Sequence, residues 1–198
     1  MFGVDGFEPW TGVDGKYQSS NPRIMVLGEQ QLEAPLTDRE CILRKLGGAH
    51  DLIFDNFDQA VLGHRQWQDG YREQVRAFWE RTVFYNYNVA HALAKGGAKL
   101  SAGTRLDPLH PRLLRAMLRT YKPTHVIVWG DDNWRAIAVE GSSREHEDRL
   151  RCGEIDEPWR RIVVDGHPTL FTRVTHPSAS FAYERWSVLL ARFLALAP

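Results

Sequence analysis

Polar side chains follow four short apolar runs of this chain, and their types suit the recognition of a small polar ring. They lie in the segments Gly28-Glu29-Gln30 after the first run, Asn86 and Asn88 within or after the second, Gly130-Asp131-Asp132 after the third, and His176-Pro177-Ser178 after the fourth. An amide offers a donor and an acceptor together, a carboxylate accepts, and a histidine does either. Such residues can read a ring edge or protonate it if the fold brings them together.

The four apolar runs predict strands at residues 23–27, 82–87, 125–129 and 170–174. Helical spacing and a lysine–proline stop predict helices within 67–80, at 111–121 and at about 183–196. A weaker hairpin signal lies at 160–170. Alternating strands and helices predict an α/β fold, a three-layer sandwich with a central, mainly parallel, four-stranded sheet, formed by one domain over residues 1–198. Ligands of such sheets bind at the carboxyl ends of the strands, where the polar set lies.

Four blocks in this order, RIMVLGEQ, VFYNYN, KPTHVIVWG and THPS, resemble the uracil-DNA glycosylase superfamily over residues 23–186. The segments FEPW, FWERTVFYNYN and HPSASFAYERW also resemble an uncharacterised branch of that superfamily. Some branches carry an iron–sulfur cluster, but Cys41 and Cys152 are the only cysteines here and cannot supply its ligands. The resemblance implies DNA as partner, and hydrolysis of the N-glycosidic bond of a flipped pyrimidine without metal or cofactor.

The resemblance also implies a role for each polar residue. His176 would stabilise the departing base, Glu29 would position water and support the cationic sugar, and Asn86 would read the base edge. Asn88 and Gln30 are further candidates for base recognition. Glu33 and Asp38 are alternatives for the water-activating group.

Base flipping needs a grip on the backbone, a wedge in the duplex and an aromatic face for the flipped ring. Ser178 and the backbone after Pro177 resemble the loop that holds phosphates, and Phe181 or Tyr183 could fill the gap in the duplex. The stacking candidates are Phe54, Phe57, Tyr85 and Tyr87.

The first block departs from the superfamily pattern, because Gln31 stands where a proline is usual. Two other interpretations follow. The pocket could accept a bulky modified pyrimidine of phage DNA, which would make the protein an antiviral defence enzyme. Alternatively, the chain could be a catalytically inactive DNA-binding module of the same fold.

The charges cancel overall, with 25 basic and 25 acidic residues, yet they are unevenly placed. Residues 95–122 hold seven basic residues and one acid, a net of +6, and residues 131–157 hold nine acids and four arginines, a net of −5. We interpret the first stretch as a basic face that grips a short length of backbone.

Sequence motifs of dinucleotide enzymes, phosphate-loop enzymes, serine hydrolases and zinc proteases are lacking. We interpret Glu145-His146-Glu147 as a charged surface loop rather than a metal site. No apolar run is long enough for a membrane helix, and the first residues, MFGVDGFEPW, do not resemble a signal peptide. We therefore expect a cytoplasmic monomer.

Overall fold

A six-stranded mixed sheet forms the centre of the protein in a computed structural model that describes residues 7–29, 36–87, 108–137, 143–153, 155–178 and 181–198. The strands are β1 (Ile24–Gly28), β2 (Thr82–Asn86), β3 (His125–Trp129), β4 (Ser143–Cys152), β5 (Ile155–Val164) and β6 (His167–Val174), in the spatial order β2-β1-β3-β6-β5-β4. The four strands β2, β1, β3 and β6 are mutually parallel, whereas β5 and β4 add antiparallel pairs at one edge. The α/β class is confirmed, but the expectation of four strands was wrong.

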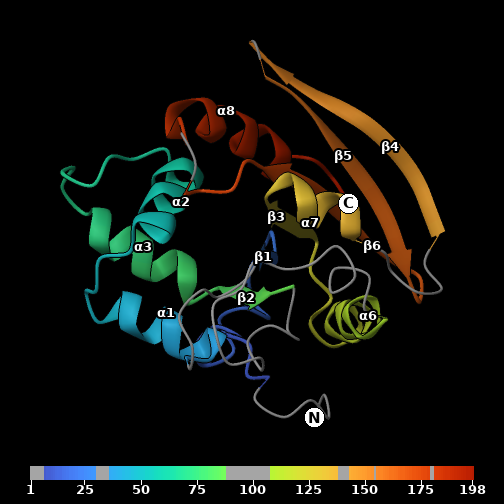
Figure 1. The fold of residues 1–198 in the computed structure, drawn as a ribbon, viewed down its shortest axis with the longest axis horizontal. Helices are drawn as coiled ribbons and strands as arrows, with labels where there is room; N and C mark the ends of the chain where they lie inside the picture. The colour runs from blue at the N-terminus through green and yellow to red at the C-terminus, as the bar shows by residue number, and fades with distance from the viewer. Residues whose placement is uncertain (1–6, 30–35, 88–107, 138–142, 154, 179–180) are drawn as a thin grey trace.

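Helices cover both faces of the sheet (Figure 1). They are α1 (Asp38–Leu46), α2 (Leu52–Leu62), α3 (Tyr71–Trp79), α6 (Leu109–Tyr121), α7 (Asp131–Ala136) and α8 (Tyr183–Leu194). Side chains alternate along a strand, so each strand supplies both cores. Val26, Phe84 and Ile127 pack with residues of α1, α2, α3 and α8, whereas Met25 and Val83 pack with residues of α6 and α7. This arrangement makes three layers.

The two additional strands, β4 and β5, form a long ribbon that extends past the parallel strands at the outer edge of the molecule (Figure 1). The predicted hairpin at 160–170 is present as the antiparallel pair of β5 and β6. The backbone of Glu145-His146-Glu147 belongs to β4, so its assignment to a loop was wrong. Its many charged residues hid this strand from a search for apolar runs, although charge is common on edge strands because it discourages pairing with other chains.

The basic stretch lies only partly within the described residues, as α6 and its C-cap Lys122. Arg115 and Arg119 pair there with Asp165, which precedes β6 at the amino ends of the parallel strands. These two arginines therefore lie at the opposite end of the sheet from the predicted site. Two acids of the acidic stretch, Asp131 and Glu157, pair with Arg173 of β6, each at 2.7 Å.

Candidate functional site

A cavity of about 480 Å³ lies at the carboxyl ends of the parallel strands, and three residues predicted for the site line it: Glu29, Asn86 and His176. We call it the base cavity. Glu29 follows β1, Asn86 ends β2 and His176 follows β6, so strands far apart in the sequence supply its polar groups. Other lining residues come from α1, from the connection to α2 and from β3.

Two glycines make this convergence possible. Gly28 pairs with Asn86 in the β1–β2 register, and a Cβ atom at residue 28 would overlap Asn86 Oδ1. A Cβ atom at Gly130 would lie 3.1 Å from Glu29 Oε2 and 3.7 Å from His176 Cβ, and Gly130 has a φ of +85° that disfavours other residues. Close packing of the functional side chains therefore depends on the absence of side chains at residues 28 and 130.

Asn86 is held by Asp38. The backbone N–H of Asn86 donates to Asp38 Oδ2 at 3.0 Å, and Asn86 Nδ2 donates to Asp38 Oδ1 at 2.6 Å. Asp38 is the first residue of α1, whose start is fixed because Thr37 and Glu40 form a capping box. Burial raises the pKa of Asp38 to about 6, although both hydrogen bonds from Asn86 act to lower it. Asp38 was expected in a loop, but it begins a helix and holds Asn86; its role as an alternative water-activating group stays a prediction.

His176 is oriented by the residue that was predicted to grip DNA. Its Nδ1 accepts from the backbone N–H of Ser178 at 3.3 Å and lies 2.7 Å from Ser178 Oγ. Nδ1 is therefore an acceptor, so the neutral ring carries its proton on Nε2. Burial lowers the pKa of His176, which favours this neutral form. Asn56 Nδ2 donates to the Pro177 carbonyl at 2.7 Å and ties the loop to α2.

Glu29 and His176 face each other across the base cavity. Glu29 Oε2 lies 4.0 Å from His176 Nε2, too far for a hydrogen bond. About a quarter of each side chain is exposed, so both are accessible from the cavity. A neutral donor beside a carboxylate suits a reaction in which negative and positive charge develop on neighbouring atoms.

Aromatic side chains form one wall of the base cavity: Phe54, Phe84 and Trp129 line it, with Phe54 5.4 Å from each of the other two between ring centroids. Phe54 was among the predicted stacking residues. Phe84 and Trp129 were missed, although Phe84 lies two residues before Asn86 and so shares its face of β2.

Three predicted aromatic candidates lie elsewhere. Tyr85 and Tyr87 point to the opposite face of the sheet and pack in the core beneath α6, while Phe57 is fully buried among the helices on the cavity side. Alternation along β2 explains the first two errors. Phe181, predicted as a wedge, stacks on Trp186 with ring centroids 6.0 Å apart, and Tyr183 packs against the same core.

The remaining predicted residues, Gln30, Glu33 and Asn88, lie outside the described residues. Within the described part of the chain, no group of three or more His, Cys, Asp or Glu residues is arranged to hold a metal ion. No helix in the same part of the chain is long and apolar enough to cross a membrane.

The fold and its cavity define an α/β protein with a polar pocket at the carboxyl edge of a parallel sheet. A scan against models of protein families and a search of curated proteins found no match to this chain.

Proposed function

We propose that this protein is a DNA glycosylase that receives a flipped pyrimidine in the base cavity and hydrolyses its N-glycosidic bond. The observation that carries the proposal is the meeting of Glu29, Asn86 and His176 in one cavity with an aromatic wall. The resemblance of the sequence blocks to the uracil-DNA glycosylase superfamily supports the same reaction.

Each group has a role in the proposed reaction. As the bond from C1′ to the base breaks, negative charge develops on the base and positive charge on the sugar. His176 Nε2–H donates to an oxygen of the leaving base, and the Glu29 carboxylate supports the sugar cation and orients the attacking water. The water oxygen bonds to C1′, and a proton from this water balances the charge on the base.

The size of the base cavity favours one substrate class over another. Its volume of about 480 Å³ lies within the range of about 300–1,000 Å³ found for sites that hold drug-sized ligands. A plain pyrimidine ring fills only part of this space. We therefore propose, as a second candidate, that the substrate is a pyrimidine with a bulky substituent, such as those of phage DNA.

The test is abasic-site formation on single-stranded and duplex DNA that contains uracil or pyrimidines with substituents of increasing size. We expect product with at least one substrate, and a loss of about 100-fold or more for His176→Ala, as when an oxyanion donor is removed. His167→Ala is a matched control, because His167 lies at the amino end of β6, away from the base cavity, and its ring hydrogen-bonds the Pro123 carbonyl at 3.1 Å. Absence of product from every substrate, with DNA binding retained, would support the catalytically inactive module instead.

A further inference from the structure

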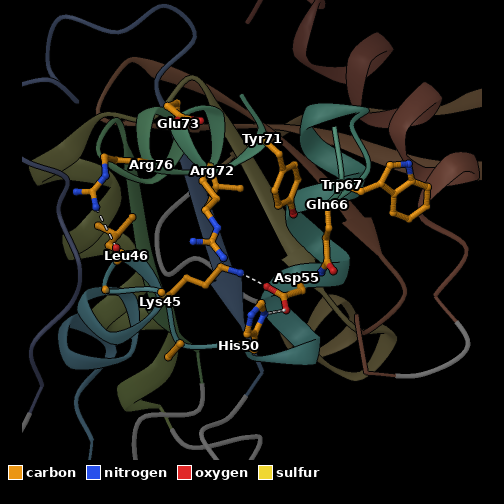
Figure 2. Close-up of a pocket in the computed structure, with 14 residues that line it drawn as sticks. Lys45, Leu46, His50, Asp55, Gln66, Trp67, Tyr71, Arg72, Glu73 and Arg76 are labelled. Atoms are coloured by element: carbon orange, nitrogen blue, oxygen red, sulfur yellow. Dashed lines mark hydrogen bonds and ion pairs between the residues drawn. The ribbon is translucent and has the colours of Figure 1, made fainter. Parts of the chain in front are cut away.

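A second cavity, of about 620 Å³, is shown in Figure 2. It is enclosed by the end of α1, the connection from α1 to α2, and the first turns of α3. Lys45, Ala49 and His50 line both cavities, so the connection after α1 forms a wall that they share. The two cavities are therefore direct neighbours.

Cationic side chains converge on this second cavity. Arg72 extends from α3 toward the end of the cavity that Lys45 occupies (Figure 2). Lys45 is 7% exposed and pairs with Asp55 and with Asp58, the latter at 2.9 Å. Arg76 also lines the cavity and donates to the Leu46 carbonyl at 3.0 Å. Asp55 and Asp58 already neutralise Lys45, whereas Arg72 has no ion pair among the described residues, so Arg72 is the cation that an anion in this cavity would meet.

The amino end of α3 adds further donors. The helix begins at Tyr71 after Gly70, without a hydrogen bond from a capping side chain, and its first-turn residues Tyr71, Arg72 and Glu73 line the cavity. The Tyr71 N–H already donates to the Gln68 carbonyl at 3.2 Å, so the amides that follow it in the first turn are the ones that favour an anion.

Tyr71 supplies independent evidence for a ligand. Its side chain points into the cavity (Figure 2), the residue is only 7% exposed, and its hydroxyl has no hydrogen-bond partner among the described residues. A buried hydroxyl without a partner costs free energy, which a ligand oxygen would recover.

An aromatic ring at the rim indicates what else the ligand carries. Trp67 lines the cavity, is 72% exposed, and has the Arg65 guanidinium 5.2 Å from its ring centroid. Exposed aromatic rings near arginines are the surfaces on which proteins stack the bases of single-stranded nucleic acid.

We propose that the second cavity binds a phosphate group of the DNA strand, with the adjoining base stacked on Trp67, next to the nucleotide whose base enters the base cavity. Tyr71 and Arg72 donate to the phosphate oxygens. The position of the strand relative to the base cavity rests on the proposed function. Binding of DNA in the second cavity does not itself require cleavage of the N-glycosidic bond.

The experiment measures binding by Trp fluorescence and calorimetry, with three probes: a short single-stranded DNA of unmodified bases, a nucleoside monophosphate and inorganic phosphate. Arg72→Ala should weaken binding of the DNA about tenfold and reduce the salt slope by about 0.7, the value for one phosphate contact on a single strand. Tyr71→Phe, which keeps the ring, should weaken it severalfold. Arg81→Ala is the matched control, because Arg81 is exposed just beyond α3 and outside both cavities.

Equal effects of Arg72→Ala and Arg81→Ala on affinity and salt slope would overturn the proposal. Binding of inorganic phosphate that depends on Arg72, without binding of the DNA, would overturn its assignment to the strand. If DNA binding depends on Arg72 while no substrate yields abasic product, the second cavity stands as a nucleotide site and the proposed glycosylase function fails.

Discussion

The carboxylate of Asp38 accepts two hydrogen bonds from Asn86, one from its backbone and one from its amide nitrogen. A carboxylate can only accept, so the amide nitrogen must face Asp38, and Oδ1 lies against Gly28. Asp38 thereby decides which way the amide of Asn86 faces. Uracil and cytosine present opposite donor and acceptor patterns, so under the proposed function this orientation would set which pyrimidine edge the amide pairs with.

Asp38→Asn is therefore expected to reduce discrimination between uracil-like and cytosine-like bases. The new amide can either accept or donate, so the Asn86 amide is free to turn. We expect the ratio of kcat/KM values for the two base types to fall about tenfold or more, the size of one good bidentate contact. Asp14→Asn, at an exposed turn, is the control. An unchanged ratio in a folded Asp38→Asn protein would contradict the role given to Asp38.

Stability should also depend on pH through Asp38. Its pKa is raised to about 6 in the folded protein from an ordinary value of 3.8, so the folded state binds the proton more tightly than the unfolded state does. The contribution of Asp38 is fully present below pH 3.8 and is lost as the pH rises through about 6. We expect the free energy of unfolding of the wild type to fall relative to that of Asp38→Asn by about 1–3 kcal/mol between pH 4 and 7. Urea unfolding at several pH values measures this; parallel curves would contradict it.

Gly28→Ala should displace Asn86, because the added Cβ overlaps Asn86 Oδ1 and lies 3.0 Å from the ring of Phe84. We expect a loss of stability of about 1–3 kcal/mol, as for other overpacked sites. In the Asn86→Ala background most of this cost should disappear. A double-mutant cycle followed by urea unfolding tests the coupling, and strictly additive costs would show that residues 28 and 86 do not compete for space.

If the protein catalyses the proposed reaction, its activity should persist below the ordinary pKa of histidine. Burial lowers the pKa of His176, so Nδ1 remains an acceptor for Ser178, and the neutral form is lost only as the pH falls through this lowered pKa. The acid limb of the kcat profile should therefore lie below pH 6.5.

Ser178→Ala removes the hydroxyl but keeps the backbone N–H, so we expect a loss in kcat of about tenfold or less, consistent with about 0.5–1.5 kcal/mol for one hydrogen bond. A loss as large as that of His176→Ala would instead place Ser178 in direct contact with the substrate.

Lys45 neutralises two buried carboxylates and should be essential for stability. Burial lowers the pKa of Lys45, but Asp58 and Asp55 outweigh this effect and raise it, so the side chain is an ammonium. Lys45→Met leaves Asp55 and Asp58 without their cation and should cost about 3–5 kcal/mol. The double variant Lys45→Met/Asp58→Asn should recover part of this loss in urea unfolding. A double variant less stable than Lys45→Met alone would show that Asp58 stabilises the fold independently of Lys45, through its bond from Trp79 Nε1 at 2.8 Å.

The sequence alone determined the four parallel strands, because a strand buried on both faces is a continuous apolar run. It also predicted three of the six described helices, α3, α6 and α8, of which α6 has an apolar stripe at helical spacing, and it missed α1, α2 and α7. It also determined that Glu29, Asn86 and His176 follow or end those strands. The edge strand β4 escaped detection because it is not buried between layers and its residues need not be apolar.

Only the tertiary structure decided how these residues are held. The bond from Asn86 to Asp38 spans 48 residues, and the contact of Pro177 with Asn56 spans 121. Local sequence carries no record of such pairs, because they form only when separate strands and helices pack against one another. The same packing decided that Phe84 and Trp129, rather than Tyr85 and Tyr87, line the base cavity, and it placed the second cavity beside it.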